Sequence, residues 1–323
     1  MINSFFPWIG GKKLLRSAIL ARFPPQHDRY VEVFGGAAWI LFAKPPERHE
    51  IYNDYNSDLT NLFYAVKYKH MEFLHELGFL PLNGKEEFDL MMAWNKQQDF
   101  TLPHMDSEME LAKRYLSPVQ FEEYCAMVRE KALLGDVRRA ANFYKLIRYS
   151  YAGGSSSFNG QPVDLMQNYQ TIWLANRRLN ENGVKTPLER RQADGTAGDG
   201  VSILNKSYAD LLPMVSREGT FAYCDPPYYG TEKLYEKRFS LEDHYHLHEL
   251  ACDFAGYIML SYNDCEFIRD LYRNDFHVES VERMNSIAQR YNPGGVYKEL
   301  IITNYDPNEK RNQQPKQLSL LTN

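Results

Sequence analysis

Short hydrophobic runs alternate with helical periodicity along the first part of the chain. Residues 30–34 form a β-branched and aromatic run that passes through Gly35-Gly36 into an apolar stretch at 37–43. Residues 50–54 form a second such run, and a helical pattern with Ser57 as its N-cap continues to about residue 68. Strand, glycine turn, helix, strand and helix in this order predict a doubly wound parallel sheet, and so an α/β fold.

The same alternation returns in the last third of the chain, after a stretch of different character. Residues 70–148 are predicted to be largely helical, and a glycine- and serine-rich segment, one more helix and a loose loop follow before residue 200. The later pattern predicts strands at 220–224, 257–262, 277–282 and 298–305 and helices at 241–255 and 264–274, in addition to a helix at 12–22 near the start.

These patterns predict three parts. A sheet domain comprises residues 1–68 and 201–305, and a mostly helical domain at 69–200 is inserted into it. The tail, 306–323, is polar and rich in Asn and Gln, and we expect it to be disordered.

Charge is distributed unevenly over the predicted insertion. The whole chain has a net charge of −5, which argues weakly against a nucleic-acid partner. However, residues 70–128 hold 4 Lys/Arg and 11 Asp/Glu, whereas residues 129–191 hold 11 Lys/Arg and 5 Asp/Glu. A basic segment beside an acidic one indicates a face suited to phosphate. The high aromatic content, 14%, fits either an aromatic core or surfaces on which bases stack.

Other compositional features narrow the class of protein. Cys125, Cys224, Cys252 and Cys265 have no CxxC spacing, so neither a disulfide framework nor a zinc site is expected. No apolar run approaches the roughly 20 residues that cross a membrane, and the first residues lack the order of a signal peptide. We therefore expect an intracellular, cytoplasmic protein without a membrane partner.

The most informative motif is Asp225-Pro226-Pro227-Tyr228, which directly follows a predicted strand. An exocyclic amine on a base is a poor nucleophile because its lone pair is delocalised into the ring. Its two N–H groups can donate to a carboxylate and a backbone carbonyl, and these two hydrogen bonds favour a tetrahedral nitrogen whose lone pair is free to react. Asp225 can supply the carboxylate and Pro226 the carbonyl. Consecutive prolines fix the backbone, and the Tyr228 ring offers a face for a base outside its stack. Alternatively, the prolines end a strand and Asp225 caps a turn.

Three further segments are candidates for contacting an adenosine-containing cofactor. Glycines after the first strand permit a tight turn and close approach to a ligand, and an acidic residue after the second strand commonly holds ribose hydroxyls. Near the start, a Trp can pack beside a cofactor and a Lys can bind its carboxylate. Each also has a purely structural explanation as a turn, an exposed carboxylate or a core-anchoring loop. The candidates are Trp8, Gly10, Gly11, Lys12, Glu32, Phe34, Gly35, Gly36 and Asp54, together with Asp225.

Taken together, these segments resemble the Dam-type family of adenine-specific, S-adenosylmethionine-dependent DNA methyltransferases. Trp8-Ile9-Gly10-Gly11-Lys12 is similar to the family's W-x-G-G-K, and Glu32 to Gly36 resembles its E-P-F-x-G turn with Val33 in place of proline. Asn53 to Leu59 resembles its D-x-N-x-D-L segment, and Asp225 to Tyr228 matches its catalytic tetrapeptide. Residues 261–264 and 298–300 resemble its late strands. A further glycine, common in the family after Gly36, is replaced by Ala37-Ala38.

The resemblance implies a Rossmann-like methyltransferase sheet with an inserted target-recognition domain. It implies that Trp8, Lys12, Asp54 and Asp225 contact S-adenosylmethionine and that duplex DNA is the partner, with the target adenine rotated out of the helix. A restriction–modification role fits, as do regulation and phage protection, and a monomer is plausible. The alternatives are methylation of cytosine N4, methylation of RNA, and a DNA-binding relative without activity.

The basic part of the insertion is the predicted DNA-binding region. Arginine and lysine neutralise phosphates, and arginine can also bind guanine edges. Asn159 lies in Phe158-Asn159-Gly160, which is similar to an F-N-G of the family. Many of these side chains could equally belong to a solvated helical face. The candidates are Arg138, Arg139, Arg148, Asn159, Arg177 and Arg178.

Three histidines, His244, His246 and His248, raise the question of a metal site. On a helix, His244 and His248 would share a face, but no third ligand has a clear spacing. We therefore expect no metal, and we expect the three histidines to lie at the surface.

Overall fold

The computed structural model describes residues 2–78, 84–86, 88–89, 91–92, 105–122, 124–125, 137–150, 158, 165–181, 200–230, 239–284 and 296–308. The chain is organised as two compact units. The first unit comprises Met1–Gly11, Gly36–Pro46 and Tyr52–Asn205, and the second comprises Lys12–Gly35, Glu47–Ile51 and Lys206–Asn323. The predicted domain boundaries at 69 and 200 are a separate division and stay a prediction.

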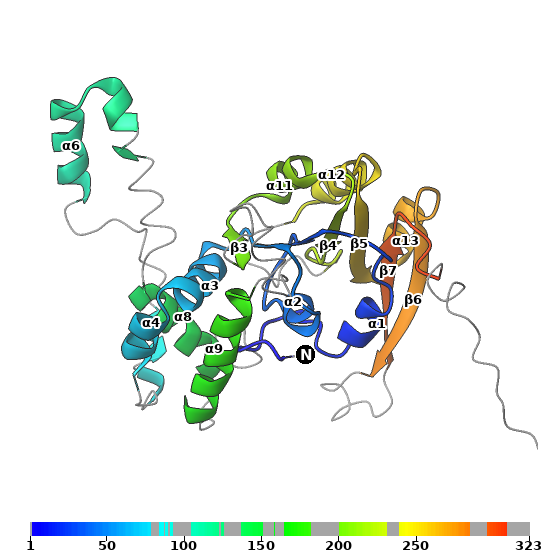
Figure 1. Cartoon of the computed structure of the whole chain (residues 1–323), viewed down its shortest axis with the longest axis horizontal. Coiled ribbons are helices and arrows are strands. Elements are labelled where there is room, and N and C mark those ends of the chain that lie inside the picture. The colour runs from blue at the N-terminus through cyan, green and yellow to red at the C-terminus, as the bar shows by residue number, and fades with distance from the viewer. Residues whose placement is uncertain are drawn as a thin grey trace, which may run out of the picture. The chain divides into compact units, whose positions relative to one another are not determined.

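The described strands form one mixed sheet with the order β3-β2-β1-β4-β5-β7-β6 (Figure 1). β1 is parallel to β4 and β4 is parallel to β5, whereas β7 runs antiparallel to both β5 and β6. This confirms the predicted α/β fold, which has the mixed sheet of a Rossmann-like methyltransferase. The strands are β1 Arg29–Glu32, β2 His49–Asn53, β3 Val201–Leu204, β4 Thr220–Cys224, β5 Tyr257–Asn263, β6 His277–Met284 and β7 Val296–Thr303.

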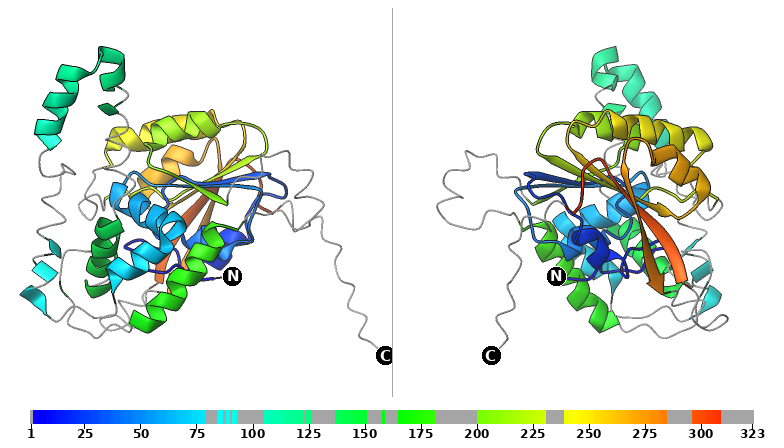
Figure 2. Two further views of the ribbon diagram at one scale, coloured as in Figure 1. Left: turned by 60° about the vertical axis from the view of Figure 1, so that its left-hand side comes forward. Right: turned by 90° about the vertical axis from the view of Figure 1, so that its right-hand side faces the viewer.

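The central strands are buried on both faces. Every residue of β4 is buried, as are the inner five residues of β5, so these strands show almost no alternation of polar and apolar side chains. In the second unit, helices α11 (Tyr208–Val215), α12 (Leu241–Cys252) and α13 (Glu266–Tyr272) succeed one another on one face of the sheet (Figure 2). Helix α1 (Arg16–Leu20) lies on the opposite face.

Helices dominate the first unit. α3 (Ser57–Tyr68) packs against α8 (Val137–Tyr149) and α9 (Leu165–Leu179), and α4 (His70–Leu77) packs against α8. The N-terminal segment inserts Phe5 among these helices, where its ring contacts Phe42, Phe63 and Tyr144. The unit also contains α2 (Trp39–Ala43) and α6 (Met105–Tyr115).

Several element boundaries differ from the predictions. The helix predicted at 12–22 is shortened to Arg16–Leu20, and the helix predicted from residue 37 begins at Trp39 because Ala38 adopts a left-handed φ of 54°. The N-cap of α3 is Asn56 and not Ser57: its side chain accepts hydrogen bonds from the backbone N–H groups of Asp58 and Leu59. The glycine- and serine-rich segment, most of the loop at 192–200 and most of the tail lie outside the described residues.

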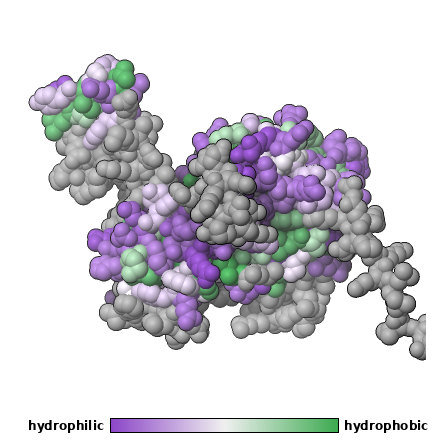
Figure 3. All heavy atoms as spheres, in the orientation of Figure 1, coloured by the Kyte–Doolittle hydropathy of each residue, from purple (hydrophilic) through white to green (hydrophobic). Residues whose placement is uncertain are grey.

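Among the described residues, no helix is long and apolar enough to cross a membrane. On the face drawn in Figure 3, hydrophilic side chains prevail over the described surface, as water-facing side chains require.

Candidate active site

Asp225 begins the loop that leaves the buried end of β4. Because β1, β4 and β5 are parallel, their carboxyl ends meet at the same edge of the sheet, where ligands bind in open α/β folds. Pro226 is buried, Pro227 and Tyr228 are half-buried, and the Asp225 side chain is 18% exposed. The motif predicted from sequence therefore lies at the position where this fold places its chemistry.

Two side chains hold the Asp225 carboxylate. The Lys12 ammonium lies 2.7 Å from Oδ2, and the Ser261 hydroxyl donates to Oδ1 at 2.9 Å. Ser261 comes from β5, the neighbour of β4, and its hydroxyl also lies 2.9 Å from the buried Tyr223 hydroxyl. The carboxylate is thus fixed from both sides before any substrate arrives. Lys12, which was predicted to bind a cofactor carboxylate, also pairs with the proposed catalytic residue.

A second carboxylate, Glu299, belongs to the same cluster. It lies on β7 opposite Asn263 of β5, is almost fully buried, and accepts the Tyr228 hydroxyl at 2.6 Å. Its Oε2 atom is 4.0 Å from the Lys12 ammonium, which in turn lies 4.7 Å from the centre of the Tyr228 ring. Glu299 fixes the tyrosine that was predicted to stack on a base.

Sequence reasoning did not assign a role to Glu299 or Ser261. The signals available were the acidic residue directly before the apolar run Leu300-Ile301-Ile302 of β7, and the resemblance of both late segments to the family. We call Lys12, Asp225, Tyr228, Ser261 and Glu299 the carboxylate cluster.

The surroundings of Asp225 in this cluster favour its protonated form more than water would. Burial raises the pKa of Asp225, the Lys12 ammonium opposes that increase, and the negative charge of Glu299 adds to it. The pKa of Asp225 therefore lies above its ordinary value. Burial, helped by Asp225 and Glu299, also raises the pKa of Tyr228 well above the usual tyrosine range, so that its hydroxyl stays a donor.

The other predicted cofactor residues of the second unit lie around the end of β1. Glu32 is buried and accepts the Tyr30 hydroxyl at 3.1 Å. Phe34 is half-buried and stacks at 5.7 Å on Tyr208, and Gly35 is buried beside it. A buried carboxylate at a strand end can accept hydrogen bonds from a cationic or hydroxyl group.

Asp54 and Gly36 meet in the first unit. The Asp54 carboxylate accepts the Gly36 backbone N–H at 2.8 Å and the Asn56 N–H at 2.7 Å. Gly36 has φ +48°, and a Cβ there would come within 3.2 Å of the Trp8 ring, so glycine fits both the backbone and the space. These contacts bring together three of the predicted residues from separate motifs.

Gly10 and Gly11 form the turn that follows Trp8. The Gly11 N–H donates to the Trp8 carbonyl at 3.1 Å, and Gly10 is exposed. A Cβ on Gly11 would lie 2.6 Å from the Trp39 ring nitrogen, which excludes a side chain. This close packing explains Gly11, whereas Gly10 adopts a φ of 77°, which favours glycine.

The predicted DNA-binding arginines fall into two groups. Arg139 is buried and binds Asp58 at 2.5 Å and the Ser57 hydroxyl at 2.8 Å, and Arg178 is buried with a bond to the Leu41 carbonyl at 3.0 Å. These two hold helices of the first unit together, which does not fit direct contact with phosphate. Arg138 and Arg177 are exposed and Arg148 is half-buried. Asn159 lies outside the described residues.

The expectation that all three histidines lie at the surface is wrong for His244. It is fully buried, and its Nδ1 lies 3.0 Å from the Tyr262 hydroxyl. The 3.6-residue helical period turns His244 toward the sheet, while His246 stays exposed.

A rigid carboxylate after a central parallel strand, followed by Pro-Pro-Tyr, defines a Rossmann-like enzyme that methylates an amine. The chain belongs to the D12 class of N6 adenine-specific DNA methyltransferases, whose sequence pattern matches residues 8–287. It is 24% identical over 285 residues to the retron Ec67 DNA adenine methylase of Escherichia coli, covering 85% of this chain and 82% of that one. It is 22% identical over 286 residues to the DNA adenine methylase of Serratia marcescens, covering 84% and 87%.

Membership of this family answers two questions that the motifs left open. The reaction is methylation of adenine and not of cytosine, and the substrate is DNA. The family also implies a methyl donor.

Proposed function

We propose that the chain transfers the methyl group of S-adenosylmethionine to the N6 amine of an adenine taken out of duplex DNA, with Asp225 and the Pro226 carbonyl orienting that amine. The observation that carries this proposal is the Asp225 carboxylate, held by Lys12 and Ser261 at the end of β4. An ionised carboxylate offers about four acceptor sites. Asp225 can therefore keep both partners and still accept an amine N–H.

The remaining residues of the loop restrict how the base can lie. Pro226-Pro227 fixes the backbone, so the carbonyl that accepts the second N–H needs little reorganisation. The hydrogen bond to Glu299 holds the Tyr228 hydroxyl, and this limits where the ring on which the adenine stacks can lie. The raised pKa of Asp225 makes it a better proton acceptor than an exposed aspartate, once the amine has become acidic through methylation.

The chemistry of the donor groups fits S-adenosylmethionine. When bound, this group supplies a methyl made electrophilic by its positive sulfur, and no metal is needed. Asp54 can accept from ribose hydroxyls, Lys12 can bind the cofactor carboxylate, and Glu32 can bind a cationic or hydroxyl group. Gly36 gives a turn without a side chain beside Trp8. We propose as cofactor-binding residues Trp8, Gly10, Gly11, Lys12, Glu32, Phe34, Gly35, Gly36, Asp54 and Asp225.

DNA binding is proposed for the predicted insertion, residues 69–200. Of the arginines considered, Arg138, Arg148 and Arg177 are the ones whose placement allows contact with phosphate. Arg138 reaches Glu76 at 3.2 Å across exposed surface, and such a pair is worth little and is readily exchanged for phosphate. Asn159 is proposed as a base or backbone contact by resemblance alone.

The test of the catalytic assignment is Asp225→Ala, assayed for N6-methyladenine in a mixed-sequence duplex with S-adenosylmethionine as donor. We expect loss of at least about 100-fold in kcat, because a preorganised group that acts on the reacting atoms is removed. Asp210→Ala, an exposed aspartate on α11, is the matched control and should keep its activity. Near-normal turnover of a folded Asp225→Ala protein would reject the assignment.

The ribose role of Asp54 has a separate test. Asp54→Ala should weaken cofactor binding measured by calorimetry by about tenfold or more, since a hydrogen bond to a charged group contributes roughly 1.5–3 kcal/mol. Asp54→Asn keeps the shape of the side chain and part of its acceptor capacity. Its cofactor affinity should therefore lie between that of the unaltered chain and that of Asp54→Ala. Unchanged affinity in both variants would exclude a ribose contact.

A further inference from the structure

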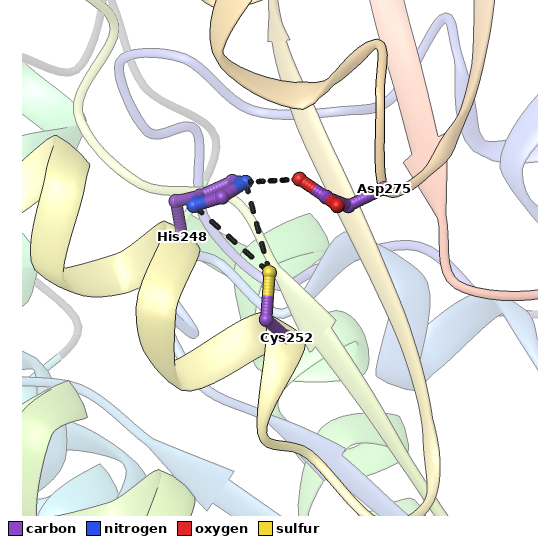
Figure 4. A group of neighbouring side chains, drawn as sticks. All are labelled: His248, Cys252 and Asp275. Atoms are coloured by element: carbon purple, nitrogen blue, oxygen red, sulfur yellow. Dashed lines mark hydrogen bonds and ion pairs between the residues drawn. The ribbon is translucent and has the colours of Figure 1, made fainter.

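A cluster outside the active site combines three side chains that bind transition metals. His248 and Cys252 lie one helical turn apart near the end of α12, and Asp275 lies in the turn between α13 and β6 (Figure 4). Their ligand atoms all lie within 4.8 Å of one another. The helix presents the imidazole and the thiol on the same side, and the carboxylate faces them from the neighbouring turn.

The distances in this cluster match those around a tetrahedral zinc ion. Zinc bonds are about 2.3 Å to sulfur and about 2.0–2.2 Å to nitrogen and oxygen, which at tetrahedral angles separates nitrogen from sulfur by about 3.6 Å and nitrogen from oxygen by about 3.3 Å. In the structure, His248 Nε2 lies 3.7 Å from Cys252 Sγ and 3.4 Å from Asp275 Oδ2. These separations leave room for one ion among the three side chains. Because Cys252 Sγ also lies 4.0 Å from His248 Nδ1, the imidazole must turn to point Nε2 at that ion.

Neighbouring groups prepare the cluster for a cation. The His248 ring packs edge-on against Tyr272 at 5.0 Å and Phe276 at 5.8 Å. Asp275, Asp253 and Glu249 place negative charge around the Cys252 thiol. The same negative charge attracts a metal ion, which can displace the thiol proton on binding.

We propose that His248, Cys252 and Asp275 form a binding site for one zinc ion, with water completing the coordination. The ligand set of one nitrogen, one sulfur and one carboxylate oxygen is characteristic of zinc and excludes calcium and magnesium, which prefer oxygen alone. The ion joins the end of α12 to the turn that leads into β6. Its role is to stabilise this part of the second unit, and it takes no part in methyl transfer.

The absence of this site from the sequence-based expectation has a clear reason. His248 lies on α12 with Cys252, whereas His244 is turned inward and the third ligand, Asp275, comes from a separate element. Helix α13 packs against α12, and Asp275 follows three residues after the end of α13, so folding brings it to α12.

Cobalt(II) is the probe for the test, because a thiolate ligand gives it a charge-transfer absorption that a site of nitrogen and oxygen lacks. The full chain, stripped with a chelator and kept reduced, should take up one cobalt ion with this absorption, and zinc should displace the cobalt. Zinc should also raise the thermal unfolding temperature. Cys252→Ser and Asp275→Asn should each weaken uptake. Loss of an outer partner of a metal site already costs about 10–100-fold in affinity, so loss of the sulfur should cost more.

Two control variants separate this site from other ligands. Cys125→Ser removes a thiol in the first unit and His246→Ala removes an exposed imidazole of the same helix, and both should bind cobalt as the unaltered chain does. Because Cys252 and Asp275 are exposed, their variants should fold, which circular dichroism verifies. No thiolate absorption in the unaltered chain, or equal uptake by Cys252→Ser, would overturn the proposal.

Discussion

Lys12 is the residue on which the charge balance of the active site depends. Its ammonium lies 2.7 Å from Asp225 and 4.0 Å from Glu299, so one cation faces two buried or half-buried carboxylates. Two like charges that share a site raise each other's affinity for protons, and a cation between them lowers it. The ionisation of Asp225 is therefore controlled by its neighbours as well as by burial.

Opposite changes in pH dependence should follow from removing the two neighbouring charges. Asp225 must be ionised to accept the amine, so activity is lost as pH falls through its raised pKa. Glu299→Gln removes a charge that raises this pKa, and the acid limb of the kcat profile should move to lower pH. Lys12→Met removes a charge that lowers it, and the limb should move to higher pH. Both are measured with cofactor and DNA at saturation.

Glu299→Ala serves as the comparison for this experiment. Alanine removes the acceptor for the Tyr228 hydroxyl as well as the charge, so kcat should fall at every pH. Glutamine retains an acceptor, so it should change mainly the pH at which the acid limb of the kcat profile falls. Shifts of the same sign in Lys12→Met and Glu299→Gln would contradict the electrostatic description.

At this scale the sequence predicted the residues that lie in compact motifs. Asp225, Tyr228, Lys12, Gly36 and Asp54 were each proposed from a few neighbouring residues, and their functional roles stay predictions. The partners of Asp225 and Tyr228 could not be found in this way, because Ser261 and Glu299 approach them only when β5 and β7 take their places in the sheet. Such pairing depends on contacts between residues far apart in sequence, which local patterns do not contain.

The beginning of α2 shows how one residue sets an element boundary. Ala38 is fully buried and adopts φ +54°, a conformation that costs a residue with a Cβ about 1–2 kcal/mol. Glycine is common in the family near this position. The strain locates the turn between Gly36 and α2, and it explains why the helix starts at Trp39.

A pair of glycine substitutions should separate strain from packing. Ala38→Gly relieves about 1–2 kcal/mol of left-handed strain. It also loses a buried methyl group, at about 0.8 kcal/mol, and adds chain entropy, at about 0.4–1 kcal/mol, so the gain and the two losses nearly cancel. Ala37→Gly, at an equally buried position without positive φ, has no such relief. We expect Ala37→Gly to lower the free energy of unfolding in urea by about 1–2 kcal/mol more than Ala38→Gly. Equal losses would show that Ala38 is not strained.

Elements with a continuous apolar run or a clear helical period were predicted best. The strand at 220–224 agrees with β4, and the predicted helices at 241–255 and 264–274 contain α12 and α13. β3 and α11 were missed. β3 has only four residues, and α11 carries Pro213 within its eight, so neither gives a clear signal. The mixed direction of the sheet was also missed, since a strand's sequence does not encode the direction of its neighbour.

Acidic and basic residues are concentrated in different stretches of the chain. A net charge of −5 is therefore compatible with a DNA substrate, because the basic stretch can contact phosphates. The acidic stretch 70–128 and the basic stretch 129–191 both lie in the predicted insertion. Part of the basic excess is used internally, since the guanidinium groups of Arg139 and Arg178 are buried against Asp58 and the Leu41 carbonyl. The number of cations that can release counterions from DNA is therefore smaller than the sequence count implies.

Salt dependence of DNA binding should measure this number. Each phosphate neutralised contributes about 0.9 to the slope of the logarithm of affinity against the logarithm of salt concentration. Arg177→Ala should lower the slope by about that amount and weaken binding to all sequences alike, whereas Arg273→Ala, equally exposed but paired with Asp270 beyond α13, should leave it unchanged. Fluorescence anisotropy from low to physiological salt gives both slopes. If Arg177→Ala kept the full slope, Arg177 on α9 would not contact the DNA phosphates. The electrostatic contact would then have to come from Arg138, Arg148 or basic residues outside the described part of the chain.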